Sequence, residues 1–290
     1  MDIDYKIAVM GDIHSNHIAL ETCINHALTR NVDEFIFLGD YISDCAYPQK
    51  TMQIIYDMNK KYKCHFIRGN REDYMLNHRK DPDEIWTYYS TSGSLLYTYE
   101  NLSKEDLDFF EGLAIKGFYE KDGFPSFRYC HGSLTSSREY LGGENENAKV
   151  IMSELDVDFL IGAHTHMQGN TSFGNKKLLN PGSVGIPKYH NGKSQYMILH
   201  GTSSGWEEEF FQLAYDVDAV VKEYETSGLD KKALWWTKIN IHLLYTGEDY
   251  SDSCIMLARK LCREAGDEVN GLEIPEKYIE MAVKALDIRL

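Results

Sequence analysis

Short apolar runs recur along the chain, and five of them end beside a glycine that has Asp, Asn or His next to it. These runs are residues 7–10, 35–38, 64–67, 127–130 and 159–161. An apolar run of this length that stops at a glycine predicts a buried strand followed by a sharp turn. Ligands of open α/β sheets bind just outside the carboxyl ends of the strands. The five runs therefore predict one polar site, assembled from five strand ends.

Helical patterns separate the first three predicted strands. Residues 17–30 and 48–61 carry apolar side chains at helical spacing, and Pro48 stands at a favourable first-turn position. Alternating strands and helices predict a parallel sheet. Residues 72–118, rich in helix formers and aromatics, predict a helical cap inserted beside the site, with Ser103 as an N-cap.

The second half of the chain predicts further strands and one helix over residues 145–154. The predicted strands are residues 127–132, 159–166, 177–180, 195–200 and 206–213. Residues 216–290 return to helical spacing, with predicted helices starting near residues 216, 251 and 275. We therefore expect an α/β fold with two packed sheets flanked by helices. Residues 1–215 are expected to form the main domain, and residues 216–290 a helical C-terminal extension packed on it. Trp235 and Trp236 are expected in that contact or in a dimer interface.

The polar residues at the strand ends resemble the motifs of the calcineurin-like metallophosphoesterase family. The blocks are Gly11-Asp12-Ile13-His14, Gly39-Asp40, Gly69-Asn70, His131-Gly132 and Gly162-Ala163-His164-Thr165-His166. The resemblance covers roughly residues 5–215 and is nearest to a small bacterial phosphodiesterase branch, whose pattern residues 180–185 also fit.

The resemblance implies two divalent metal ions with Asp40 bridging them. One ion would be held by Asp12, His14, Asp40 and His166, and the other by Asp40, Asn70, His131 and His164. If the chain stays extended beyond the strands, Asp12 and His14 project to the same side. His164 and His166 would then lie about 6.6 Å apart, which suits two ions about 3.5–4 Å apart.

Oxygen and nitrogen ligands without thiolates favour manganese, with iron, zinc or nickel as alternatives. The expected nucleophile is a hydroxide that bridges the two ions, and the expected substrates carry phosphodiester or phosphoanhydride bonds. Nucleotides such as dinucleoside polyphosphates are the expected type, because cap aromatics could stack a base. Asn70, His131 and Arg71 are the expected catalytic and substrate-binding residues. Alternatively, the aromatic side chains of the cap form its own apolar core. We prefer this second prediction to base stacking.

Arg71 departs from the family pattern, in which a histidine able to protonate the leaving group often follows the asparagine. A guanidinium stays charged and cannot serve as that acid, but it can bind a phosphate oxygen. The alternative for Arg71 is a surface ion pair with Glu72 or Asp73. His17 and His190 are candidates for the missing acid. Asp44 is expected either to orient a neighbouring side chain of the site or to be a loop residue without a role there.

The composition of the chain argues against nucleic acids and membranes as partners. The 290 residues carry a formal net charge of -15, which argues against a broad nucleic-acid surface. No apolar stretch is as long as a membrane span, and the acidic start of the chain is unlike a secretory signal, so a cytoplasmic protein that does not bind membranes is expected. A homo-oligomer stays open. Two other functions also stay open: a phosphomonoesterase or protein serine/threonine phosphatase, and a scaffold that has lost catalysis.

Overall fold

Strand β1 (Tyr5–Met10) is buried on both of its faces. Ile7 and Val9 pack between two sheets, whereas Ala8 and Met10 pack against helices on the outer side. This alternation follows from the two-residue repeat of a strand, and it makes β1 the centre of a layered α/β structure. The computed structural model describes residues 5–81, 83–143, 145–202, 204–267 and 273–288.

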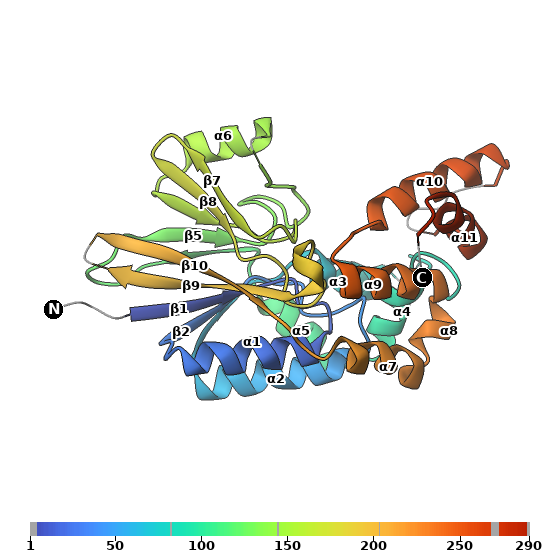
Figure 1. The fold of residues 1–290 in the computed structure, drawn as a ribbon, viewed down its shortest axis with the longest axis horizontal. Coiled ribbons are helices and arrows are strands. Elements are labelled where there is room, and N and C mark those ends of the chain that lie inside the picture. The colour runs from blue at the N-terminus through green and yellow to red at the C-terminus, as the bar shows by residue number, and fades with distance from the viewer. Residues whose placement is uncertain (1–4, 82, 144, 203, 268–272, 289–290) are drawn as a thin grey trace.

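Two five-stranded sheets stack face to face, as the sequence predicted (Figure 1). The first has the order β10-β9-β1-β2-β3, and its further strands are β2 (Glu34–Phe37), β3 (Lys63–Phe66), β9 (Ser194–Thr202) and β10 (Gly205–Leu213). The second has the order β4-β5-β6-β8-β7, with strands β4 (Lys116–Tyr119), β5 (Phe127–Cys130), β6 (Phe159–Ile161), β7 (Gly169–Phe173) and β8 (Lys176–Asn180). The parallel strands β1, β2 and β3 place their carboxyl ends at one edge, and so do the parallel strands β5, β6 and β8.

Helices cover the outer face of each sheet. The first sheet is covered by α1 (His17–Thr29), α2 (Pro48–Lys61), α3 (Asn70–Lys80) and α5 (Lys104–Gly112), and the second by α6 (Glu146–Glu154). Ser103 caps α5 as predicted, with a reciprocal hydrogen bond to Asp106. The predicted cap over residues 72–118 is wrong at its end, because residues 116–118 belong to β4 and pair with β5.

The remaining helices gather at one end of the molecule, away from the N-terminus (Figure 1). They are α4 (Gly93–Glu100), α7 (Val217–Ser227), α8 (Leu229–Lys232), α9 (Leu234–Thr246), α10 (Ser251–Glu264) and α11 (Glu276–Ala285). Their shared apolar core includes Tyr97 from α4 and Trp236 from α9. The C-terminal helices therefore pack on the predicted cap as well as on each other. No helix among the described residues is long and apolar enough to cross a membrane.

Candidate metal centre

The predicted site residues all lie in turns that follow strand ends. Asp12 and His14 follow β1, Asp40 follows β2, and Asn70 opens α3 after β3. His131 follows β5 directly, whereas His164 and His166 follow β6. The fold thus brings to one place seven residues that span more than 150 positions of the chain.

The backbone at these residues is not extended, which corrects the prediction made from strand geometry. Asp12, His14, Asp40, His164 and His166 have φ angles between 50° and 65°. The predicted strand over residues 159–166 ends at Ile161 for the same reason. Left-handed backbone at a residue other than glycine costs on the order of 1–3 kcal/mol and tends to cluster at functional sites. These strained turns point their Asp and His side chains toward one another.

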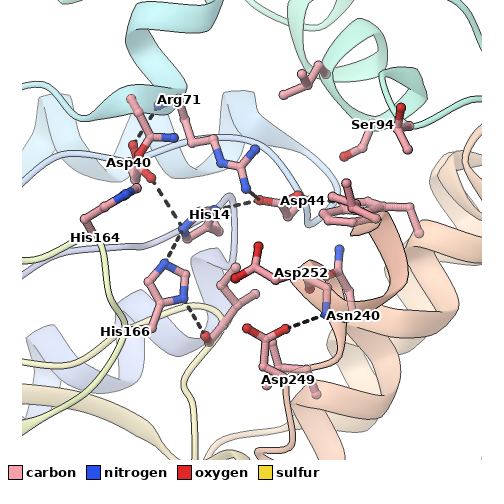
Figure 2. Close-up of a pocket in the computed structure, with 18 of the residues that line it drawn as sticks. His14, Asp40, Asp44, Arg71, Ser94, His164, His166, Asn240, Asp249 and Asp252 are labelled. Atoms are coloured by element: carbon pink, nitrogen blue, oxygen red, sulfur yellow. Dashed lines mark hydrogen bonds and ion pairs between the residues drawn. The ribbon is translucent and has the colours of Figure 1, made fainter. Parts of the chain in front are cut away.

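Two groups of potential ligand atoms result, each drawn together within 4.8 Å. Asp12, His14 and His166 form the first group, in which Nε2 of His166 lies 3.2 Å from Nε2 of His14 and 3.4 Å from Oδ1 of Asp12. Figure 2 shows Asp40 beside this group, with its Oδ2 3.7 Å from Nε2 of His14.

The second group consists of Asp40, His131 and His164. Nε2 of His131 lies 3.4 Å from Oδ2 of Asp40 and 3.1 Å from Oδ1 of Asn70. One carboxylate, Asp40, therefore faces ligand atoms of both groups, as the bridging position requires.

Hydrogen bonds to the outer nitrogens orient three of the imidazoles. Nδ1 of His131 donates to the carbonyl of Leu38, and Nδ1 of His166 donates to the carbonyl of Ile186, at 2.8 and 3.0 Å. A carbonyl only accepts, so Nδ1 keeps its proton in both rings, and once Nε2 gives up its own proton in favour of a metal ion, its lone pair points to the centre. This is the tautomer that a metal ion needs.

The donor set fits divalent ions. Oδ1 of Asp12 is buried and has no hydrogen-bond partner, although a buried carboxylate oxygen normally has one. Burial alone would raise the pKa of Asp40, but the facing His131 and His14 hold that pKa well below its usual range. Asp40 is thus an anion ready to share its charge with cations.

The segment after β8 holds the first turn in place. Amide groups of Val184 and Gly185 donate to the carbonyls of Gly11 and Asp12 at 3.0 and 2.9 Å. A Cβ atom at position 185 would stand 1.7 Å from the carbonyl oxygen of Ile13. Only glycine permits this close approach, which explains the glycine that ends the block at residues 180–185.

A buried carboxylate, Asp44, connects the first group to its surroundings. Its Oδ2 accepts from Nδ1 of His14 at 2.8 Å and pairs with Arg71 at 3.0 Å. Its Oδ1 accepts from Nε1 of Trp236 at 2.8 Å. Asp44 is therefore an orienting residue rather than a plain loop residue. Trp236 is a partner that no local sequence signal could connect to it.

The alternatives for the other candidates are resolved by contacts. Arg71 pairs with neither Glu72 nor Asp73: Glu72 accepts from backbone amides at residues 40, 41 and 69, and Asp73 pairs with Arg68. His17 contacts Glu223 at 3.0 Å, and neither it nor His190 lines the cavity above the metal centre.

That cavity has a volume of about 310 Å³ and extends from the metal centre to the C-terminal helices (Figure 2). Among the predicted cap aromatics, Tyr74 lines it. Trp86, Phe109 and Phe110 instead pack in the core beside the first sheet. The preferred prediction of a mainly structural aromatic cluster agrees with these positions.

Known proteins are similar to this chain in sequence or in structure. An uncharacterized protein of Methanocaldococcus jannaschii, MJ0912, is 28% identical over 242 residues, which cover 76% of this chain and 90% of that protein. A hypothetical protein of Pyrococcus horikoshii, PH1004, superposes with a TM-score of 0.70 at 20% identity, over 84% of this chain and 99% of the other. A metallophosphoesterase of Sphaerobacter thermophilus superposes with a TM-score of 0.66 at 17% identity, over 84% and 100% of the two chains. These structural similarities concern the fold.

The family assignment comes from the sequence. The family described as "Calcineurin-like phosphoesterase" matches residues 5–168, which is more than half of the 290 residues. The match ends shortly after His166, so it spans all five strand ends that build the two ligand groups. The chain belongs to the calcineurin-like phosphoesterase family.

Proposed function

We propose that this protein is a phosphoesterase that hydrolyses phosphodiester or phosphoanhydride bonds of small substrates with the help of two divalent metal ions. The observation that carries the proposal is the pair of ligand groups with Asp40 between them. Such an arrangement suits hydrolysis at phosphorus, and the family membership supports the same reaction class.

The proposed ligands of the first ion are Asp12, His14, Asp40 and His166. The proposed ligands of the second are Asp40, Asn70, His131 and His164. When bound, two such ions polarise phosphoryl oxygens and lower the pKa of water. Manganese is the proposed metal, and iron, zinc and nickel suit the same donors.

Arg71 is proposed to bind a phosphoryl oxygen rather than to donate a proton. Burial lowers the pKa of Arg71, but Asp44 and Asp40 raise it above its ordinary value, so the guanidinium keeps its charge. Its Nε is buried without a hydrogen-bond partner. Because Arg71 cannot protonate a leaving group, substrates with leaving groups of low pKa are expected to react fastest.

The cavity disfavours a protein phosphatase. Helices α4, α9 and α10 all contribute to its lining, so the metal centre lies within a cavity framed by these helices. A folded phosphoprotein would have to place its phosphorylated side chain between them. The complete ligand groups likewise count against a scaffold without catalysis.

The test is hydrolysis of bis-p-nitrophenyl phosphate, p-nitrophenyl phosphate and diadenosine tetraphosphate by metal-stripped protein, with and without added manganese. We expect manganese-dependent turnover that Asp40→Ala abolishes and that Asp57→Ala, a change at an exposed residue of α2, preserves. Equal turnover by wild type and Asp40→Ala would contradict the proposal, as would none with any of the four candidate metals.

A further inference from the structure

We infer that the outer half of the cavity recognises a compact, uncharged, hydroxyl-rich group, such as a sugar or polyol, attached to the phosphoryl group at the metal centre. The inference rests on the proposed two-metal phosphoesterase function, and it assigns the substrate to the phosphomonoesters, the alternative that the sequence left open, instead of the diesters and anhydrides. We call this half the outer wall. It consists of Ser94 of α4, Lys188, Asn240 of α9, Asp249 just before α10, and Asp252 and Arg259 of α10.

The outer wall contains buried polar atoms that lack partners. Asn240 is 1% exposed, and its Nδ2 has no hydrogen-bond partner. Ser94 is 2% exposed, and its Oγ has none either. Figure 2 shows Ser94 and Asn240 on opposite sides of Asp44, on separate helices that face the same cavity. Since unsatisfied buried polar groups are costly, a ligand that hydrogen-bonds to both would recover that cost.

The charges of the cavity cancel beyond the ligand groups. Apart from the proposed ligand Asp40, three cationic and three anionic side chains line it, and two of the pairs are direct: Asp44 with Arg71 at 3.0 Å, and Lys188 with Asp249 at 2.9 Å. Asp252 and Arg259 add one charge of each sign. A chain of phosphates needs an excess of positive charge, and this wall has none. One phosphoryl group at the metal centre is therefore the only anionic part that the cavity accommodates well.

Size points the same way. A volume of about 310 Å³ lies at the lower end of ligand sites. A dinucleoside polyphosphate would extend well beyond it. A monosaccharide phosphate fits, and hydroxyl, amide and carboxylate groups are the partners that sugar hydroxyls need. Leu95, Leu243 and Ile255 offer apolar contact to its C–H groups.

Sugar 1-phosphates also agree with the presence of an arginine, instead of a proton-donating side chain, at position 71. The anomeric oxygen of a sugar 1-phosphate leaves as a hemiacetal, which is more acidic than a simple alcohol. Hydrolysis would add water across the P–O bond, giving inorganic phosphate and the free sugar, with no further reactant needed.

The experiment measures kcat/KM of the manganese-loaded full chain for α-glucose 1-phosphate, myo-inositol 1-phosphate, glycerol 3-phosphate, phenyl phosphate and diadenosine tetraphosphate. At least one polyol phosphate should exceed diadenosine tetraphosphate. Asn240→Leu, which keeps the volume and removes the amide, should lower the ratio of polyol phosphate to phenyl phosphate about tenfold, as expected for one lost hydrogen bond that discriminates between substrates. Ser94→Ala should shift the ratio in the same direction. Thr237→Val is the matched control, because Thr237 is a buried residue of α9 that does not line the cavity, and it should leave the ratio unchanged.

Two results would overturn the inference while leaving the proposed function intact: preferred turnover of diadenosine tetraphosphate, or an unchanged substrate ratio in Asn240→Leu. Failure to hydrolyse any of the tested esters with any candidate metal would instead remove the proposed function. Calorimetric titration of the manganese-loaded protein with the non-hydrolysable phosphonate analogues of α-glucose 1-phosphate and myo-inositol 1-phosphate then tests the wall by itself, and lack of binding of both would count against it.

Discussion

The carboxylate of Asp44 is the most informative single group to change, because it touches a proposed metal ligand, a proposed substrate-binding residue and the C-terminal helices. It accepts hydrogen bonds from His14, Trp236 and Ser43 and pairs with Arg71, all within 3.0 Å. Asp44→Asn keeps the shape and removes the charge. One of the two accepting oxygens becomes an amide that donates.

The expected loss has two parts. Oδ2 faces three donors and Oδ1 only Nε1 of Trp236, so the amide nitrogen takes the Oδ1 side. His14 then donates to a neutral carbonyl oxygen, which holds its ring less firmly than a carboxylate does. Changes to such orienting groups cost about 10–100-fold in metal affinity, which is about 1.4–2.7 kcal/mol. Arg71 also loses its direct partner. Because its side chain is 20% exposed and Asp40 still faces it, we expect about 3 kcal/mol of lost stability, the lower end for a broken buried pair.

Calorimetric titration of the metal-stripped protein with manganese measures the first part, and urea unfolding measures the second. Asp249→Asn is the matched control, since it breaks the ion pair with Lys188 without touching a proposed ligand. Manganese affinity within twofold of wild type in Asp44→Asn would refute the argument that the Asp44 carboxylate orients His14 for metal binding, even if the stability fell as expected.

Three further outcomes follow from the same contacts. Burial raises the pKa of Glu34, but the hydrogen bond from Lys63 and other partners lowers it below its ordinary value. The stability it contributes is therefore full above the pKa of a free glutamate, about 4.3, and is lost as pH falls through the lower folded pKa. Urea unfolding of Glu34→Gln should show a deficit at pH 7 that disappears in acid, and a constant deficit would contradict this. A Cβ at Gly69 would lie 2.2 Å from Oδ1 of Asp40, so Gly69→Ala should destabilise by about 3 kcal/mol and abolish manganese binding; near-normal binding would show that the turn adapts. Manganese at 100 times its dissociation constant should stabilise wild type against urea by about 2.7 kcal/mol for one site, and Asp40→Ala should gain much less.

Several elements of the fold were not predictable from local patterns. β7 has the polar sequence GNTSF, and β4 has only four residues, so neither carries the apolar run of a buried strand. α9 begins without a capping side chain and is apolar around its circumference, so its sequence lacks both a start signal and a polar face. These elements form because neighbouring strands and helices cover them. The limits of the predicted main domain and of its C-terminal extension stay a prediction.

The sequence by itself determined the layered α/β class and the residues of both ligand groups, because strand endings and turn residues are local and leave local patterns. The tertiary structure alone decided what those residues contact. Asp44 and Trp236 lie 192 positions apart, and the outer wall joins α4 to α9 and α10 across a similar span. Such contacts depend on how remote surfaces pack, and packing is set by three-dimensional fit rather than by periodicity along the chain. The ligand groups are therefore encoded locally, and the lining of the cavity beside them is encoded in the packing.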